Sequence, residues 1–462
     1  MLRHVDKPME GTDRENSAFP AGFTWGVATS AAQIEGAARA DGRGPSVWDT
    51  FASLPGRIAG DGTPEVAVDH YHRFEEDIGL MKDLGVGAYR FSVSWSRIQP
   101  DGRGPVNAAG MDYYKRLVDA LLEAGIEPWV TLYHWDLPQA LQDQRGGWLS
   151  RDTAEFFGQF SSLVGNALGD RVTRFFTMNE FYSFIDQGYG DGSYAPGLRV
   201  GRKELNQARH HALLGHGYSV SALRAGKAEL KVGLAENPVL YQPVMETDEH
   251  VHAARTAFRE LNGHFLTAVM EGAYPDVYLE KEGRNAPRVR GDDFAAIGQS
   301  LNFLGINAYT PVYVAADPER ERGYAVLDYP VSYPRMGIHW LLFGPQACYW
   351  PFRFAHELWS VRELLIGECG AACEDKVDRS GNVRDTDRVL FLRHYLEQAA
   401  RAIREGIPLR GCFLWTLMDN FEWATGYTKR LGLYYTRYPD LTRIPKLSAD
   451  YYREVIRTNR VP

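Results

Sequence analysis

The stretch Met111–Tyr133, MDYYKRLVDALLEAGIEPWVTLY, contains the unit that decides the fold. Met111–Ala124 carries apolar residues at the spacing of one helix face, and Gly125 is a typical helix stop. Glu127–Tyr133 is then a short apolar run typical of a buried strand, as is Gly85–Ser94 (GVGAYRFSVS) before the helix. Strand, helix and strand in this order predict two parallel strands joined by a helical crossover.

The same alternation continues along the chain, and no Pro/Ser-rich linker or low-complexity segment interrupts it. We expect a helix at Ala154–Ala167 and further strands at Arg174–Thr177, Lys231–Leu234, Phe303–Asn307, Leu364–Gly367 and Gly411–Trp415. So many units in one undivided chain of 462 residues predict an α/β fold, a single (β/α)8 TIM barrel enlarged by its loops. We assign residues 1–20 to a flexible N-terminal extension and residues 21–462 to the barrel domain.

The overall composition argues against several classes of partner. A net charge of −8 disfavours nucleic acid and anionic membranes, because both attract basic surfaces. No stretch approaches the roughly 18 apolar residues of a membrane-spanning helix. No GxGxxG motif follows a predicted strand, and no GxxxxGK[ST] loop occurs. We therefore expect a protein that works without a cofactor, a nucleic acid or a membrane.

The cysteines and histidines give no sign of a metal site. Cysteines at positions 348, 369, 373 and 412 are too few for a disulfide framework and lack the spacing of a zinc site. His210, His211 and His216 share one helical stretch without an HExxH arrangement, so we interpret them as structural. The first residues, MLRHVDKPMEGTDRENSAF, lack the apolar run of a secretory signal. Reduced thiols and a cytoplasmic location are the expectation.

Polar and aromatic side chains occur where the predicted strands end: Arg90, His134, Asn179, Glu180, Asn307, Tyr309, Glu368 and Trp415. The carboxyl ends of the strands form the active-site face of a (β/α)8 barrel. A single glutamate at a strand end also fits a buried ion pair or a helix cap, but convergence of the whole set weakens that interpretation. Two carboxyl groups in one pocket, one protonated and one ionised, suit acid/base cleavage of a glycosidic bond. The aromatic content, with 11 Trp and 25 Tyr, also suits a sugar ligand.

Several long motifs resemble those of glycoside hydrolase family 1, the β-glucosidase family, in the right order from Phe23 to about Tyr452. The motifs are Phe23–Gly36 (FTWGVATSAAQIEG), Tyr89–Ile98 (YRFSVSWSRI), Thr131–Pro138 (TLYHWDLP), Thr177–Glu180 (TMNE), Gly188–Gly197 (GYGDGSYAPG), Trp415–Trp423 (WTLMDNFEW) and the closing segment Arg443–Tyr452. The resemblance implies that the barrel is the catalytic domain of a retaining β-glycosidase that forms a covalent glycosyl-enzyme intermediate.

The resemblance also assigns roles to single residues. It makes Glu180 the acid/base and Glu368 the nucleophile, with Arg90 and Tyr309 hydrogen-bonded to Glu368. It implies that Asn179 holds the sugar 2-hydroxyl. The substrate-binding residues that it implies are Gln33, His134, Asn307, Trp340, Trp415, Glu422 and Trp423, with Trp415 beneath the ring and Trp340 at the aglycone entrance. The expected partner is a small β-glucoside with an aryl or other small aglycone, and a homo-oligomer stays open.

The sequence departs from the family beside the nucleophile. The family usually has Thr-Glu-Asn-Gly there, whereas this chain has Gly367-Glu368-Cys369-Gly370. Two side chains that would support the site are therefore absent. We expect Glu368 still to point into the barrel, and the Cys369 thiol to lie between the barrel and the helices. We further expect the nearby carboxylates to raise the pKa of that thiol.

Three alternatives remain beside a β-glucosidase. A 6-phospho-β-glucosidase would have Ser in place of the sugar-binding Glu422, and Lys429 is common to both patterns. A catalytically impaired sugar-binding relative would usually lack one of the two carboxylates, and its only support here is Gly367 and Cys369. Transglycosylation would use the same intermediate as hydrolysis. The sequence does not decide the aglycone, or glucose over galactose or fucose.

Overall fold

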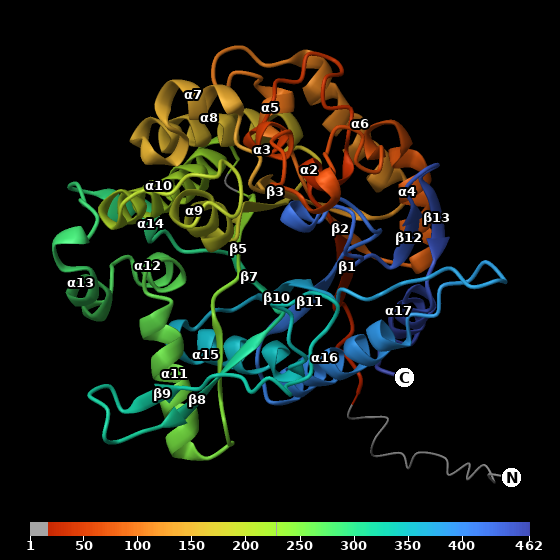
Figure 1. Cartoon of the computed structure of the whole chain (residues 1–462). Helices are drawn as coiled ribbons and strands as arrows, with labels where there is room; N and C mark the ends of the chain where they lie inside the picture. The colour runs from red at the N-terminus through yellow and green to blue at the C-terminus, as the bar shows by residue number, and fades with distance from the viewer. Residues whose placement is uncertain (1–16, 228) are drawn as a thin grey trace, which may run out of the picture.

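The computed structural model describes residues 17–227 and 229–462, and within them eight parallel strands close into a barrel (Figure 1). The strands are β1 (Thr24–Ala28), β2 (Ala88–Ser92), β3 (Glu127–Tyr133), β4 (Arg174–Asn179), β5 (Lys231–Glu236), β7 (Phe303–Asn307), β10 (Leu364–Cys369) and β11 (Leu409–Trp415). They follow each other around the barrel in chain order, and β1 closes the ring by pairing with both β2 and β11. The predicted TIM barrel is confirmed.

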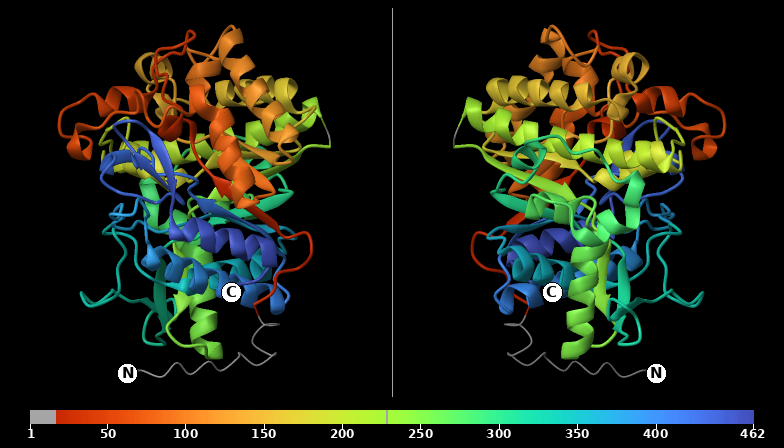
Figure 2. Two further views of the ribbon diagram at one scale, coloured as in Figure 1. Left: turned by 90° about the vertical axis from the view of Figure 1, so that its right-hand side faces the viewer. Right: turned by 90° about the vertical axis from the view of Figure 1, so that its left-hand side faces the viewer.

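Helices surround the barrel on its outside (Figure 2). The longer ones are α4 (His70–Leu84), α6 (Ala108–Glu123), α8 (Arg151–Leu168), α10 (Arg202–Gly226), α11 (Asp248–Leu261), α15 (Trp350–Trp359), α16 (Thr386–Arg404) and α17 (Leu447–Thr458). In α6, for example, Tyr114, Leu117 and Leu121 are buried. The predicted helix at Met111–Ala124 begins three residues earlier, because its first turn consists of the small residues Ala108, Ala109 and Gly110, which carry no pattern of large apolar side chains.

Three strands run two residues further than predicted. β4, β5 and β10 end at Asn179, Glu236 and Cys369, where the apolar runs of the sequence had already stopped. The last residue of each strand is polar or carries a thiol, yet all of the additional residues are buried. Their side chains are stabilised by hydrogen bonds and packing at the end of the barrel, which an apolar pattern does not reveal.

The N-terminal boundary of the barrel lies before the predicted residue 21. Phe19 is 6% exposed and packs 4.7 Å from both Phe23 and Trp25, ring centre to ring centre. Its amide donates to the carbonyl of Asn459 at 2.9 Å, and Ala18 forms a β-bridge with Arg460. The extension predicted for residues 1–20 is therefore too long, and its first sixteen residues lie outside the described part. None of the helices in the described ranges has the length and apolarity that crossing a bilayer demands.

Candidate active site

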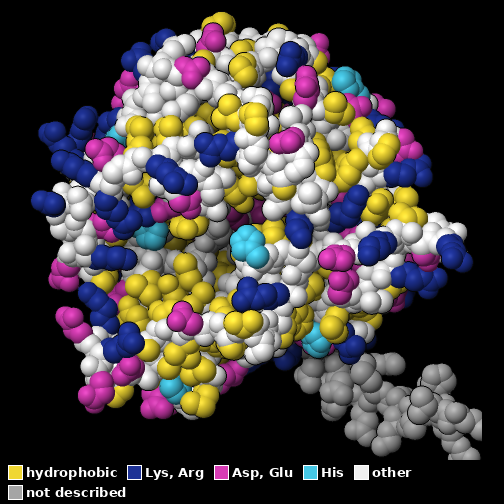
Figure 3. Space-filling model, in the orientation of Figure 1, with side chains coloured by type: hydrophobic (Ala, Val, Ile, Leu, Met, Phe, Trp, Pro, Cys, Tyr) yellow, Lys and Arg dark blue, Asp and Glu magenta, His cyan; other side chains and the backbone are white. Residues whose placement is uncertain are grey.

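A cavity of about 610 Å³ opens at the carboxyl ends of the barrel strands, and Figure 3 shows its mouth as a central hollow. The described residues that line it include eight of the predicted site residues: His134, Glu180, Tyr309, Trp340, Glu368, Trp415, Glu422 and Trp423. The other four, Gln33, Arg90, Asn179 and Asn307, are buried behind this lining and hydrogen-bond to it. The structure therefore gathers all predicted site residues at one place.

Glu368 lies on β10 between a cation and a phenol. Arg90 on β2 donates from Nη1 to Oε1 at 3.0 Å, and Tyr309 donates from its hydroxyl to Oε2 at 2.9 Å. Arg90 is 1% exposed and also donates to the carbonyl of Gly367. Burial raises the pKa of Glu368, whereas Arg90 and Tyr309 oppose that rise by stabilising the ionised form. Both hydrogen bonds expected to Glu368 are present.

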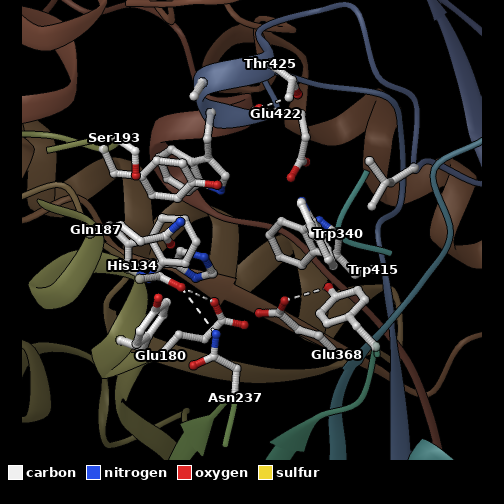
Figure 4. A pocket seen from close by; sticks show the side chains of 18 of the residues that line it. His134, Glu180, Gln187, Ser193, Asn237, Trp340, Glu368, Trp415, Glu422 and Thr425 are labelled. Atoms are coloured by element: carbon white, nitrogen blue, oxygen red, sulfur yellow. Dashed lines mark hydrogen bonds between the residues drawn. The ribbon is translucent and has the colours of Figure 1, made fainter. Parts of the chain in front are cut away.

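Glu180 follows β4 with a left-handed backbone, φ 54°, and its amide donates to the carbonyl of Ala235 at 3.0 Å. Asn307 Nδ2 donates to Oε1 at 2.6 Å, and Ser183 Oγ donates to Oε2 at 2.8 Å. Both partners are neutral. Burial, followed by the charge of Glu368, raises the pKa of Glu180 to about 8. Figure 4 shows the carboxyl groups of Glu180 and Glu368 facing each other across the cavity floor.

A buried amide network connects the two carboxyl groups. Asn179 Oδ1 accepts from Arg90 Nη2 at 2.6 Å and from Asn307 Nδ2 at 3.1 Å, while Asn179 Nδ2 lies 3.2 Å from His134 Nε2. The role predicted for Asn307 in binding the sugar stays a prediction. Its amide nitrogen is shared between Asn179 and Glu180, and it is not among the described residues that line the cavity.

Glu422 lies across the cavity from Glu180 and Glu368 (Figure 4). Gln33 Nε2 donates to its Oε2 at 3.4 Å and to the carbonyl of Phe421 at 2.9 Å. Burial, followed by the charge of Glu368, raises the pKa of Glu422 to about 8. Gln33 is fully buried, so its amide orients Glu422 from behind.

Aromatic rings complete the lining. The ring of His134 is nearly parallel to Trp415, at 19° and 5.5 Å between centres, and to Trp423, at 16° and 5.9 Å. Burial, followed by the charge of Arg90, holds the pKa of His134 well below its usual range, so the ring is neutral. Flat apolar faces beside hydrogen-bonding edges suit a ligand with the same alternation, as in a sugar ring.

A second cavity of about 430 Å³, which we call the side groove, joins the first at its mouth. Tyr182, Asn237 and Trp340 line both cavities. The side groove is further lined by Glu236, Pro238, Val239, Asn262, His264, Phe265, Leu266 and Thr310. Trp340 is 38% exposed at the junction, and Figure 3 shows hydrophobic side chains gathered beside the hollow.

The two residues that flank Glu368 have different consequences. A Cβ added at Gly367 would lie 2.7 Å from Asn307 Oδ1, so the glycine leaves room for the Asn307 amide. Cys369 is 1% exposed and points away from the cavity, as predicted. The pKa of its thiol is raised, but burial and the neighbouring thiol of Cys348 are the causes. The predicted cause, the catalytic carboxylates, was wrong because the side chain faces the helices.

The histidines of α10 have structural partners. His210 contacts Asp293 at 2.9 Å, His211 contacts the carbonyl of Trp148 at 3.1 Å, and His216 contacts a threonine hydroxyl of β4. All three are buried, and burial lowers the pKa of each. The interpretation of these histidines as structural agrees with their contacts.

Ser183 and Asn237 also line the cavity beside Glu180, although neither is among the residues predicted from the sequence. Ser183 Oγ contacts Glu180 directly, and Asn237 Nδ2 donates to Ser183 Oγ at 3.3 Å. Two signals were available. Asn237 is polar and follows a predicted strand, and Ser183 stands three residues after Glu180, one turn along α9 (Phe181–Ile185).

Comparisons with known proteins agree with this geometry. The model of the family described as "Glycosyl hydrolase family 1" matches residues 15–461. Beta-glucosidase A of Acetivibrio thermocellus is 40% identical over 444 residues, covering 96% of this chain and 98% of the relative. A 1,4-beta-D-glucan glucohydrolase of Thermotoga neapolitana is 41% identical over 446 residues, with 96% and 98% covered.

Solved structures give the same result. The family 1 β-glucosidase of Thermotoga maritima has a TM-score of 0.88 and 39% identity, over 96% of this chain and 99% of that one. The T. maritima enzyme has also been solved in complex with glucoimidazole, with the same TM-score and identity. The chain therefore belongs to glycosyl hydrolase family 1, and it is a glycoside hydrolase of the β-glucosidase class.

Proposed function

We propose that the enzyme hydrolyses β-glucosides with retention of configuration, using Glu368 as nucleophile and Glu180 as acid/base. The observation that carries this proposal is the unequal setting of two facing carboxyl groups. Glu368 has a guanidinium and a phenol on its two oxygens, whereas Glu180 has only an amide and a hydroxyl. The first setting favours an ionised group and the second a group that can hold a proton near neutral pH.

In the first step, Glu368 attacks the anomeric carbon while Glu180 gives its proton to the glycosidic oxygen. The bond to the aglycone breaks, the alcohol leaves, and a glycosyl ester of Glu368 forms. Asn179 is proposed to hold the sugar 2-hydroxyl, and Arg90 fixes its amide by donating to Oδ1. Trp415 is proposed to lie beneath the sugar ring, whose hydroxyls would meet His134, Glu422 and the Trp423 edge.

In the second step, water attacks the anomeric carbon, Glu180 takes its proton, and the ester bond breaks so that Glu368 leaves as a carboxylate. Forming the ester removes the negative charge of Glu368, which is one cause of the raised pKa of Glu180. The pKa of Glu180 therefore falls in the intermediate, and the group that was an acid becomes a base. The charge of one carboxyl group thus controls the role of the other.

The lining of the cavity supports a neutral glycone. Among the described residues that line it none is Lys or Arg, while Glu180, Glu368, Glu422 and Asp191 are acidic. Lys429, which a phosphate-binding site could use, donates to the carbonyl of Gly337 instead. A phosphorylated sugar would find no cation here, so a 6-phospho-β-glucoside is not favoured.

The side groove supports an aryl or other small apolar aglycone. It begins at Trp340 and Tyr182 and continues over Val239, Phe265 and Leu266. A planar aromatic group would bury apolar surface there against Trp340, Phe265 and Leu266. The relative named 1,4-beta-D-glucan glucohydrolase indicates the alternative, a saccharide leaving group.

Proton NMR of the first sugar released from a nitrophenyl β-glucoside tests the mechanism. We expect β-glucose first, with α-glucose appearing only by mutarotation. α-Glucose as the first product would mean inversion and would remove the nucleophile role of Glu368. Initial rates on nitrophenyl glycosides, cellobiose and phenolic glucosides then test the aglycone, and faster hydrolysis of cellobiose than of aryl glucosides would contradict the aryl preference.

A further inference from the structure

The two oxygens of the Glu180 carboxyl group have neighbours of different kinds. Asn307 Nδ2 donates to Oε1 at 2.6 Å and to Asn179 Oδ1 at 3.1 Å. If the Asn307 amide turned by half a turn, its oxygen would face both of these oxygens at once. The amide is therefore fixed, and Oε1 always faces an N–H donor.

The Oε2 side has no such restriction. Ser183 Oγ lies 2.8 Å from Oε2, and a hydroxyl donates in one rotamer and accepts in another. Asn237 Nδ2 lies 3.3 Å from Ser183 Oγ. Asn237 Oδ1 is buried and has no hydrogen-bond partner among the residues that the structure describes. A half-turn of the Asn237 amide therefore exchanges donor for acceptor without breaking a bond on its far side.

A general acid/base carries a proton in one half of its cycle and loses it in the other. We propose that Ser183 and Asn237 form a hydrogen-bond relay of reversible polarity that fits both states of Glu180. When Glu180 is ionised, Asn237 N–H donates to Ser183, whose hydroxyl donates to Oε2. When Glu180 is protonated in the free enzyme, its O–H donates to Ser183, whose hydroxyl donates to Asn237 Oδ1.

Within the relay the Ser183 hydroxyl rotates and the Asn237 amide makes a half-turn, and no proton is transferred to either residue. Ser183 and Asn237 are positioning residues that act through Glu180, so the inference rests on the proposed acid/base role of that residue. Asn307 cannot take their place, because its amide can only donate a hydrogen bond to Glu180 and cannot accept one from it. The relay explains why a hydroxyl and an amide with a free oxygen stand behind a group whose protonation alternates.

The backbone holds the relay in register with Glu180. Ser183 lies on the first turn after Glu180, and its amide donates to the carbonyl of Glu180 at 3.1 Å. Asn237 directly follows β5, whose last residue, Glu236, accepts from the amide of Phe181 at 3.0 Å. Strand and helix are thus joined on both sides of the acid/base, which keeps the distances of the relay short.

Other charged and titratable groups also face Glu180, and the test must separate them from the relay. They are Glu368 on β10, Arg90 on β2, Glu236 on β5, and Tyr194 and Tyr309 on the loops. These groups act through space, whereas the relay acts through the Ser183 hydroxyl. A double-mutant cycle distinguishes the two routes.

The first variant is Asn237→Asp, which ends the relay in an acceptor and so favours protonated Glu180. For a phenolic glucoside with a poor leaving group, we expect the basic limb of the pH profile of kcat/KM to move to higher pH by about one unit. On dinitrophenyl β-glucoside, turnover that depends on ionised Glu180 should fall about tenfold below pH 7, with azide restoring the rate. If the pH profile of Asn237→Asp is the same as that of the wild-type enzyme, the proposal is overturned.

The second measurement repeats Asn237→Asp in a Ser183→Ala background. If the relay operates, the shift falls to less than half; a purely through-space effect of the new carboxylate would persist in full and overturn the relay. Ser183→Thr keeps the hydroxyl and should keep the full shift. Ser161→Ala is the matched control, because Ser161 is a buried helix serine that donates only to the carbonyl of Phe157.

Failure of the relay can be told apart from failure of the proposed function. Glu180→Ala with azide should give a β-glycosyl azide from dinitrophenyl β-glucoside. If this azide forms, and Asn237→Asp shifts the pH profile equally with and without Ser183, only the relay is disproved. If no such azide forms and all substrates suffer equally, the acid/base role itself falls. Should Ser183→Ala fail to fold, Ser183→Cys keeps the volume and provides the weakened relay instead.

Discussion

The two sides of the cavity floor hold the same chemical group in opposite settings. On the side of β2, β7 and β10, Glu368 is held by a buried guanidinium and by the Tyr309 hydroxyl. On the other side, Glu180 follows β4 and is held by Asn307, which reaches it from the end of β7, and by Ser183 on α9; both partners are neutral. Two identical side chains can therefore have different roles, because the charge of their neighbours depends on where each stands around the barrel.

The nucleophile side should be the more sensitive to truncation. Glu368→Gly removes the carboxylate that we propose forms the covalent bond, and we expect activity to fall at least about 10⁴-fold. Azide can occupy the vacated space and attack from the same face, so the product should be the α-glycosyl azide. Rates and product NMR measure this, and an active Glu368→Gly enzyme without azide would remove the comparison altogether.

The acid/base side should show a loss that depends on the leaving group. Glu180→Gln keeps the size of the side chain but has no proton to give. For phenolic glucosides with poor leaving groups we expect kcat/KM to fall roughly 10³-fold, while dinitrophenyl glucosides lose little because their leaving group needs no proton. A Brønsted plot of kcat/KM against leaving-group pKa measures the contrast. Equal losses across the series would mean that the two carboxyl groups have been assigned wrongly.

Exchange of the cation tests why the two sides differ. Arg90→Met removes the charge beside Glu368, and we expect kcat/KM to fall roughly 10²- to 10³-fold. Arg90 lowers the pKa of Glu368, so its removal raises that pKa. Activity needs ionised Glu368, and the acidic limb of the profile should therefore move to higher pH. An acidic limb that stays in place would show that Arg90 has no electrostatic role; a melting curve controls for folding, since Arg90 is buried.

The charge of Glu368 should have a measurable effect on the pKa of Glu180. Glu368→Gln removes the negative charge that raises the pKa of Glu180, so that pKa should fall by about one unit or more. Carbon-13 NMR titration of labelled glutamate reports it, with Glu180→Gln assigning the signal. A pKa of Glu180 near 8 in both enzymes would mean that burial alone sets it.

The smallest effect is expected at the thiol behind the nucleophile. Cys369 is buried against Cys348 and its pKa is raised, so little reactive thiolate forms. Mild peroxide should leave the wild-type rate unchanged, and Cys369→Ser should behave in the same way. The opposite result would be a loss of activity in peroxide that a thiol reductant reverses and that Cys369→Ser does not show. That result would mean that oxidation of Cys369 regulates the enzyme.

The sequence predicted the barrel because its strands are continuous apolar runs, and β3 and β7 have the bounds that were predicted. It also located Glu180 and Glu368, since polar residues at the ends of parallel strands must meet. It could not show that Asn307 contacts Glu180, because this depends on the room beside Gly367. The direction of the Cys369 side chain decided the cause of its raised pKa, and a cytoplasmic location stays a prediction.

The contact between Phe19 and Asn459 has a consequence for engineering. Besides the backbone bond, Asn459 Oδ1 accepts from Trp25 Nε1 at 2.9 Å, and Val461 donates to the carbonyl of Ser17 at 3.0 Å. The first and last described segments therefore lie side by side next to β1. A circular permutant that joins them through a short glycine linker should keep the barrel closed, leaving the new chain ends free to be placed in an exposed loop away from the mouth.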